Sequence, residues 1–178
     1  MDEVLITSAE IQKRIAELGM QISQDYQDKK ILMVCILRGG VIFLTDLIKH
    51  ISVPVAIEFM AVSSYGTGVR SSSGEVRITL DLNTSITGRD VIIVEDIIDS
   101  GHTLSSVIEL LETRNPASLC VCSLLDKYER REVDVPLRYC GFKIKDRFVF
   151  GFGLDMDEYY RNLPFIGTVD LDRYDPQV

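Results

Sequence analysis

The 178-residue sequence has no tryptophan, only two histidines and no apolar run long enough to cross a membrane. A membrane-spanning helix needs roughly 18 or more consecutive apolar residues, so we expect no membrane partner. His50 and His102 stand in unrelated contexts, and no cysteine lies near either at the spacing of zinc ligands. The sequence therefore offers no zinc site.

Cysteine is also scarce, with four residues at positions 35, 120, 122 and 140. A chain of this size without a secretory leader does not use so few cysteines as a disulfide framework. Its acidic N-terminal segment is not a signal peptide. We expect buried free thiols and a reducing, cytoplasmic location.

Positive charge is in deficit, since 19 Lys and Arg face 27 Asp and Glu, a net charge of −8. Such a protein repels polyanions, so we expect no nucleic-acid partner. A hydrophobic fraction of 46% with 26% charged residues is ordinary for a globular chain, and the length predicts one domain over residues 1–178. Whether so acidic a protein can serve a phosphate-bearing ligand stays an open question at this point.

Hydrophobic periodicity predicts alternating helices and strands. Thr7 to Glu10 fits a capping box, and the apolar spacing after it predicts a helix to about Tyr26. Residues 30–37 form a continuous apolar run, typical of a strand buried on both faces. Helices are also expected over 41–50 and from Leu104 to near Asn115, and strands over 54–62, 76–82, 91–94, 118–125, 139–144 and 148–154. This alternation indicates an α/β domain with a mainly parallel central sheet flanked by helices.

Residues 63–75 have a different character, with three glycines, five serines and no apolar periodicity. Such composition is typical of a surface loop. A long structureless loop in a compact domain is also a common form of an active-site lid. Both interpretations stand on the sequence alone.

Residues 91–103 are the most informative stretch. Glu95 and Asp96 follow an apolar strand, at the strand end where α/β sheets bind their ligands. The turn Ser100-Gly101-His102-Thr103 then leads into a helix, whose N-terminus is a ready anion site. Acids beside a phosphate repel it unless they hold hydroxyls or a cation, and a phosphorylated sugar with Mg²⁺ meets both conditions. A solvated acidic strand end is the simpler alternative.

Two common nucleotide motifs are not found. No GxxxxGK[ST] loop occurs, and Gly66-Thr67-Gly68 and Gly151-Phe152-Gly153 both lack the third glycine of a dinucleotide fingerprint.

The segment VIIVEDIIDSGHTL resembles the phosphoribosyl-pyrophosphate signature of type I phosphoribosyltransferases. More narrowly, the chain is similar from end to end to the hypoxanthine-guanine branch of that family, through residues 37–40, 63–66, 124–127, 148–155 and 157–161. The resemblance implies a type I fold with a small base-binding hood and a flexible loop. It also implies transfer of the 5-phosphoribosyl group from phosphoribosyl pyrophosphate to N9 of hypoxanthine or guanine, with Mg²⁺, in a homodimer or homotetramer.

The resemblance also assigns roles around the sugar. Glu95 and Asp96 would hold the ribose hydroxyls and, with Asp155, the Mg²⁺ ion. Pyrophosphate would meet Arg161 and the Arg38-Gly39 turn, whose Leu37–Arg38 peptide can be cis in relatives. The 5′-phosphate would lie in the loop of Asp99, Ser100, Gly101, His102 and Thr103.

For the base, Lys127 would donate to the oxygen at C6, Phe148 would stack on the ring and the Val149 backbone would read its edge. Asp155 and Arg147 would complete the purine site, and Asp99 would act as general base or acceptor at N7. Ser64 and Tyr65 would lead the lid. His102 and Arg147 stand where relatives often have Lys. Taken alone, Lys127 would be a surface lysine and Phe148 a core residue.

Two other functions compete with this one. An RNA-binding regulator of pyrimidine genes shares the fold and signature, but it needs a basic surface, which the charge of −8 disfavours. Lys127 and the Phe148–Asp155 segment also favour a purine pocket. Lys127 disfavours adenine, because a buried donor left unpaired is costly; hypoxanthine, guanine and xanthine remain open.

Overall fold

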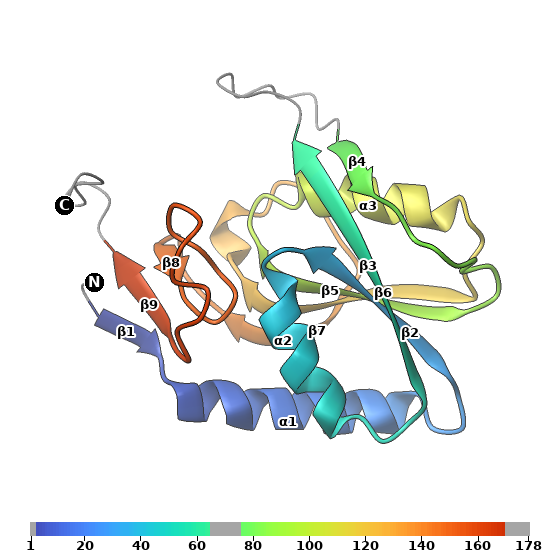
Figure 1. Cartoon of the computed structure of the whole chain (residues 1–178), viewed down its shortest axis with the longest axis horizontal. Coiled ribbons are helices and arrows are strands. Elements are labelled where there is room, and N and C mark those ends of the chain that lie inside the picture. The colour runs from blue at the N-terminus through green and yellow to red at the C-terminus, as the bar shows by residue number, and fades with distance from the viewer. Residues whose placement is uncertain (1–2, 65–75, 170–178) are drawn as a thin grey trace.

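The computed structural model of the chain describes residues 3–64 and 76–169. Its centre is a six-stranded sheet in the order β4-β3-β2-β5-β6-β7, parallel except for the β3–β4 pair (Figure 1). The strands are β2 (Ile31–Leu37), β3 (Val55–Ser64), β4 (Val76–Leu80), β5 (Asp90–Ile98), β6 (Ser118–Asp126) and β7 (Leu137–Lys143). The expected α/β architecture with a mainly parallel sheet is confirmed.

Helices cover both faces of this sheet, as the continuous apolar runs of its inner strands require. On one face, α1 (Ser8–Asp25) and α2 (Gly40–Leu47) pack on alternate residues of β2 and β5 such as Met33 and Ile92. On the other, α3 (His102–Glu112) packs on the intervening residues, such as Val34 and Ile93. Two cores therefore lie on opposite sides of one sheet.

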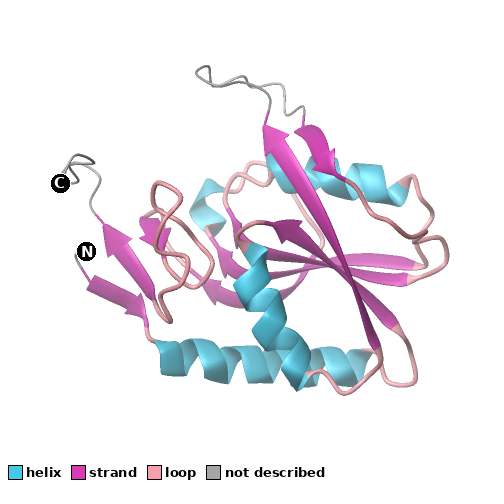
Figure 2. Cartoon of the chain, in the orientation of Figure 1, coloured by secondary structure: helices cyan, strands magenta, loops and turns pink. Residues whose placement is uncertain are grey.

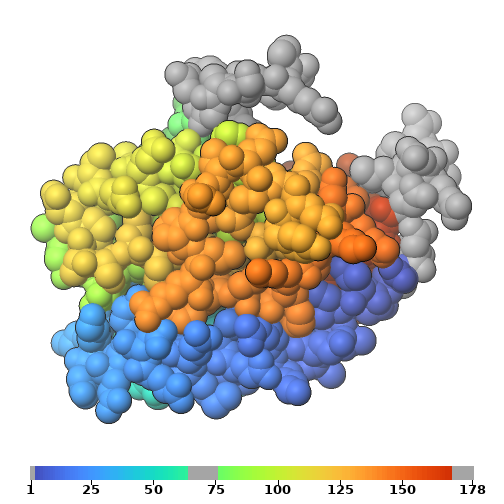
Figure 3. Space-filling model, turned by 180° about the vertical axis from the view of Figure 1, so that it is seen from behind, coloured from blue at the N-terminus to red at the C-terminus, as the bar shows by residue number. Residues whose placement is uncertain are grey.

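The first helix begins as its sequence predicts. The Thr7 hydroxyl accepts from Glu10 N at 3.3 Å, and Glu10 Oε2 accepts from Thr7 N at 2.9 Å, a complete capping box. Later along the helix, Arg14 donates to the carbonyls of Cys140 and Gly141, which fixes α1 along β7. Figure 3 shows α1 (blue) running beneath the segment that includes β7 (orange).

A second, antiparallel sheet of three strands is not evident strand by strand from the sequence. Its order is β1 (Glu3–Ile6), β9 (Ile166–Val169) and β8 (Phe148–Phe150). Neither β1 nor β9 is long enough to show a period of two, which explains why the sequence pattern missed them. We call this sheet, with the loop 151–165 between β8 and β9, the hood. Figure 2 shows that loop (pink) beside the start of α2.

Several predicted strand boundaries were wrong. The strand expected over 148–154 ends at Phe150, the one expected over 76–82 ends at Leu80, and the one expected over 139–144 spans Leu137–Lys143. Two further differences concern the site. The strand expected over 54–62 continues to Ser64, so the first two residues of the predicted lid belong to β3; the rest of the lid, with Tyr65, lies outside the described residues. The strand expected over 91–94 spans Asp90–Ile98, so Glu95 and Asp96 lie within it. Pairing with β6 carries β5 past its apolar part, as far as Ile98 opposite Asp126.

The helix expected over 41–50 divides into two parts. Its α-helical part, α2, ends at Leu47, and a short 3₁₀ turn, η1 (Ile48–His50), completes the segment. Within the described ranges, no helix combines the length and hydropathy of a membrane span. All four cysteines are free thiols, and three are buried while Cys140 is half-buried.

Thr7→Ala removes the capping hydroxyl and is expected to cost about 1 kcal/mol of unfolding free energy. In thermal unfolding followed by circular dichroism, this corresponds to a midpoint lower by about 2–4 °C. Thr45→Ala is the control, because Thr45 lies within α2 and its hydroxyl donates only to a carbonyl of its own helix. Equal midpoints for the two variants would contradict the capping role.

Candidate functional site

The acidic pair lies on the central strand, directly against the turn after β2. A Cβ added to Gly39 would lie 1.6 Å from Asp96 Oδ2, so only glycine allows this approach. A Cβ on Gly153, whose φ is +101°, would lie 2.3 Å from the Gly39 carbonyl oxygen. The acid, the turn and the hood loop are thus stacked in direct contact. The Leu37–Arg38 peptide, which the resemblance allowed to be cis, is cis.

Both carboxyl groups sit in surroundings that disfavour their charge. Burial raises the pKa of Glu95 well above its usual value, and the neighbouring Asp96 charge adds to this. Burial also raises the pKa of Asp96 to about 6, although hydrogen bonds from backbone amides and the charge of Arg161 act in the opposite direction. A ligand that brings hydroxyl donors or a cation would therefore stabilise the ionised pair.

The predicted phosphate loop follows β5 and ends at α3. Gly101 precedes the helix at φ +92°, and no side chain caps the first turn. The amides of Glu132 and Val133 donate to the Ser100 carbonyl, which fixes the loop from the far side. The first amides of a helix have no intrahelical acceptor, so this uncapped turn can receive an anion.

His102 is the first residue of α3, and its side chain contacts Glu132. Its Nε2 lies 2.8 Å from Glu132 Oε2. The loop's binding capacity therefore rests on backbone amides and hydroxyls more than on this side chain.

A ring of four charges adjoins the loop. Lys127 is 9% exposed, and its Nζ lies 3.8 Å from Asp99 Oδ2 and 3.4 Å from Asp146 Oδ1. Arg130 contacts the same two acids, with Nε 2.9 Å from Asp99 Oδ1 and Nη1 3.4 Å from Asp146 Oδ2. Asp99, the predicted general base, and Lys127, the predicted purine-binding lysine, therefore lie together in a network of two cations and two anions.

The hood loop holds the remaining predicted cations. Arg161 pairs with Asp155 at 2.7 Å and donates to the Gly153 carbonyl at 2.7 Å. Arg38 pairs with Glu158 at 2.8 Å. Arg38 and Arg161, both predicted to meet pyrophosphate, are thus held by acids of one loop.

Arg147 is not brought into this group. Its guanidinium pairs with Glu3 of β1, which joins the two edges of the hood. Its neighbours Phe148 and Val149 begin β8, where Phe148 is partly exposed and Val149 is buried. The resemblance implies that Arg147 lies beside the purine, which stays a prediction; the structure shows its ion pair with Glu3, on a strand that the sequence pattern did not reveal.

The acids do not form a metal cluster by themselves. Among residues 3–64 and 76–169, no three His, Cys, Asp or Glu side chains converge as metal ligands. Both oxygens of Asp155 have partners, Arg161 and the Glu158 amide. The pair Glu95 and Asp96 still fits Mg²⁺, because this ion commonly uses one or two carboxylates and completes its shell with water and substrate oxygens.

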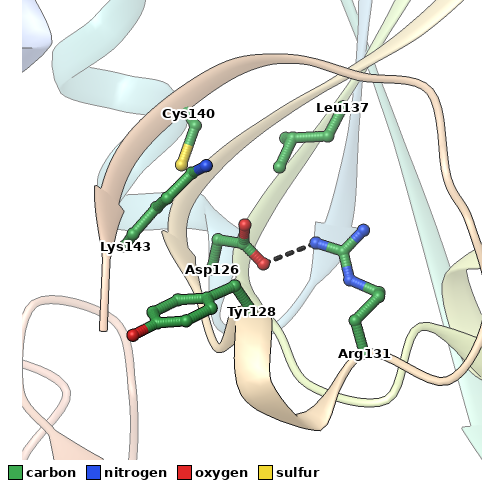
Figure 4. Close-up of a pocket in the computed structure, with 6 residues that line it drawn as sticks. All are labelled: Asp126, Tyr128, Arg131, Leu137, Cys140 and Lys143. Carbon is green, nitrogen blue, oxygen red and sulfur yellow. Dashed lines mark hydrogen bonds and ion pairs between the residues drawn. The ribbon is translucent and has the colours of Figure 1, made fainter. Parts of the chain in front are cut away.

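A pocket of about 420 Å³ lies beside this network. It is lined by residues at the end of β6, the 3₁₀ turn η2 (Tyr128–Arg130) and β7: Asp126, Tyr128, Arg131, Leu137, Cys140 and Lys143. In Figure 4, Arg131 reaches across to Asp126, at 2.5 Å. None of the predicted site residues lines it. Arg130, the last residue of this turn, and Arg131, which follows it, thus pair with different acids: Arg130 with Asp99 and Asp146, and Arg131 with Asp126.

Sequence reasoning missed Arg130, Asp146 and Glu158. Charged residues in short loops are typical of solvated surface, and only the fold brings the loops after β6 and β7 beside Asp99. The one available signal was that Arg130 follows Lys127 by three residues, because residues separated by one helical turn lie on the same side of the chain.

The fold and these groups define an α/β protein whose acidic pair and uncapped helix start lie at the carboxyl end of its central strands, where such proteins bind their ligands. The family model of the phosphoribosyl transferase domain matches residues 5–158. The chain belongs to this phosphoribosyltransferase family.

Individual relatives are similar over nearly the whole chain. A hypoxanthine phosphoribosyltransferase of Salmonella typhimurium is 52% identical over 171 residues, covering 95% of this chain and 96% of the relative. A hypoxanthine-guanine phosphoribosyltransferase of Mycobacterium tuberculosis is 53% identical and covers 94% and 85%. The crystal structure of a hypoxanthine phosphoribosyltransferase from Staphylococcus aureus matches with a TM-score of 0.93 at 48% identity, covering 98% of this chain and 95% of that one.

Asp96→Asn is expected to stabilise the metal-free protein at neutral pH. The folded pKa of about 6 exceeds the usual 3.8, so the wild type loses stability as the pH rises between these values and its carboxyl ionises. The variant has no such loss, and its advantage should grow to roughly 1–3 kcal/mol above pH 7. Glu95, Asp155 and Arg161 face the group and remain in both proteins. Urea unfolding without divalent cations, from pH 4 to 8, measures the difference.

Asp81→Asn provides a control of opposite sign. Arg114 donates two hydrogen bonds of 2.8 Å to this exposed carboxylate and lowers its pKa. Its substitution should therefore destabilise at pH 7 and lose its effect as the pH falls below 4. A constant advantage of Asp96→Asn across the pH range would contradict the assigned burial effect.

Proposed function

We propose that the protein transfers the 5-phosphoribosyl group from phosphoribosyl pyrophosphate to N9 of hypoxanthine or guanine, in purine salvage. The products are IMP or GMP and pyrophosphate. One observation carries the proposal: a buried lysine, Lys127, lies within 3.8 Å of the acid beside the phosphate loop. Lys127 would then be a donor to a 6-oxopurine and Asp99 an acceptor beside it, close to where the sugar phosphate would bind.

The sugar and its phosphates have matching groups on three segments. Glu95 and Asp96 would accept hydrogen bonds from the ribose hydroxyls, while the amides and hydroxyls of residues 100–103 would bind the 5′-phosphate. Pyrophosphate would lie by the Arg38-Gly39 turn and Arg161. Because both arginines pair with acids of the hood loop, pyrophosphate must compete with Glu158 and Asp155 for them.

Mg²⁺ is the metal that this donor set suits. Glu95 and Asp96 would hold it together with oxygens of phosphoribosyl pyrophosphate, and Asp155 would join if it released Arg161. When bound, the ion supplies positive charge to the departing pyrophosphate. The raised pKa values of Glu95 and Asp96 support a bound cation, because an uncompensated buried carboxylate is unfavourable.

Base selection would follow from the state of Lys127. Its ammonium is buried and needs acceptors, and Asp99 and Asp146 supply them at 3.8 and 3.4 Å. The C6 oxygen of a 6-oxopurine would be a further acceptor, whereas the amino group of adenine would present a donor to a donor. Phe148, partly exposed at the start of β8, would stack on the ring, and the backbone of Val149 would contact its edge.

In the chemical step, one bond breaks and another forms at C1 of the sugar. The bond from C1 to the pyrophosphate oxygen breaks, with its electron pair leaving on pyrophosphate, and a bond from N9 to C1 forms through an oxocarbenium-like state. The proton on N7 moves to Asp99, which makes N9 the better nucleophile. Ser64 and Tyr65 would help close the site against water; residues 65–75 lie outside those the structure describes.

We further propose a cytoplasmic homodimer or homotetramer. Free, mostly buried thiols suit a reducing compartment. Ile57, Phe59 and Leu80 are 38–42% exposed on the neighbouring strands β3 and β4, and large apolar side chains exposed on adjacent strands favour association with another copy.

The proposed reaction is tested with phosphoribosyl pyrophosphate, Mg²⁺ and four bases, followed by ultraviolet absorbance. Hypoxanthine or guanine should be converted, adenine should not, and xanthine is the open case. Lys127→Met should raise the KM for hypoxanthine by about 10-fold or more, since about 1–3 kcal/mol is lost with the hydrogen bond to a charged donor. If neither hypoxanthine nor guanine were converted, the proposal would be overturned.

Asp99→Asn should lower kcat strongly, by about 10²-fold or more, with little change in the binding of phosphoribosyl pyrophosphate. The amide keeps the shape of the carboxylate but cannot take up the N7 proton. Steady-state kinetics with hypoxanthine and calorimetric titration with phosphoribosyl pyrophosphate separate the two effects. Near-wild-type turnover would remove Asp99 from the reaction.

A further inference from the structure

Arg130 contacts Asp99, the proposed general base, and the proposed reaction gives Arg130 no role. Its Nε lies 2.9 Å from Asp99 Oδ1, the shortest distance in the four-charge ring. The contact is an ion pair without hydrogen-bond alignment, since Oδ1 is buried and accepts no hydrogen bond from any described residue. The Asp99 side chain as a whole is nevertheless 46% exposed.

These two facts distinguish the oxygens of Asp99. Because Oδ1 is covered and the side chain is not, the open part of the carboxylate includes Oδ2, the oxygen that faces Lys127 at 3.8 Å. A base that bonds Lys127 through its C6 oxygen would approach Oδ2 through N7, because the two atoms lie on the same edge of a purine. Arg130 occupies the other oxygen.

The backbone fixes Arg130 in this place. The Lys127 amide donates to the Ile98 carbonyl at 2.9 Å, and the Arg130 amide donates to the Lys127 carbonyl at 2.9 Å. The turn η2 is thereby attached to the end of β5, immediately before Asp99. Asp146 contacts both cations at 3.4 Å and completes the ring.

We propose that Arg130 is a positioning residue, which holds Oδ1 of Asp99 so that Oδ2 faces the N7 proton of the purine. It also supplies the second cation that two neighbouring carboxylates need, so that Lys127 is free to turn from Asp99 and Asp146 to the C6 oxygen. This inference rests on the proposed function, because it acts through Asp99 and Lys127.

If Arg130 only stabilised the fold, its removal would lower the melting temperature and leave the kinetics unchanged. The positioning role predicts the opposite. Arg130 is 49% exposed, and exposed ion pairs contribute little to folding. Removal of Arg130 should therefore leave the melting temperature nearly unchanged, while the orientation of the Asp99 carboxylate is lost. The loss should be seen in kcat and in the KM for the purine, and hardly in the KM for phosphoribosyl pyrophosphate.

The test is a double-mutant cycle of Arg130→Gln and Asp99→Asn, by steady-state kinetics with hypoxanthine. Arg130→Gln alone should lower kcat about 10-fold, a part of the roughly 10²- to 10⁴-fold that a general base contributes. In the Asp99→Asn background the same change should have less than about a 2-fold effect, because residues that act as one unit are not additive. Arg130→Lys, which restores the charge, should recover part of the loss.

Arg138→Gln is the matched control. Arg138 has a similar exposure, 47%, and its Nη2 donates to Asp25 Oδ2 at 2.9 Å near the opposite end of the sheet, so its loss should leave kcat and both KM values unchanged. Equal losses from Arg130→Gln in both backgrounds, or wild-type kinetics for Arg130→Gln, would overturn the positioning role. A fully active Asp99→Asn single variant would instead overturn the base assigned under the proposed function.

Discussion

The contact between the Asp96 carboxylate and the backbone of Gly39 sets the geometry around it. A side chain at Gly39 would overlap the carboxylate, and one at Gly153 would overlap the Gly39 carbonyl. Three segments from distant parts of the chain, β5, the turn after β2 and the hood loop, are stacked here backbone against side chain. The position of Arg38 on one side and of Asp155 and Arg161 on the other follows from this stacking.

This close packing shows how the acids of a protein of net charge −8 could be compatible with the phosphorylated substrate proposed for it. Its acids are used in separate ways: two face the site with raised pKa values, two hold Arg38 and Arg161, and two neutralise Lys127 and Arg130. The cations near the site are therefore already paired and ordered. In the proposed function, an incoming anion would replace one partner of these cations by another, and the net charge of the whole surface is a poor guide to that exchange.

Much of this arrangement could be predicted from the sequence. The buried runs of β2 and β5, the capping box of α1 and the acidic pair followed by a glycine turn each have a local physical signature. The hood had such a signature only in β8, which lies within the strand expected over 148–154; β1 has four residues and its partner strand begins at Ile166. The ion pair of Arg147 with Glu3 could not be foreseen for the same reason, because Glu3 lies on β1. Arg130 could not be recognised, since an exposed arginine acquires a role only from the acid that the fold sets beside it.

The hood joins the two ends of the described chain: β9 is its middle strand, and it pairs with β1 on one side and β8 on the other. During synthesis, β1 emerges well before its partner β9, so this pair cannot form until residues 166–169 have left the ribosome. The central sheet, whose last strand ends at Lys143, can assemble before that. A nascent chain can thus order the strand that carries Glu95 and Asp96 before the sheet that carries Phe148 and Val149, which is complete only after residues 166–169 have been synthesised.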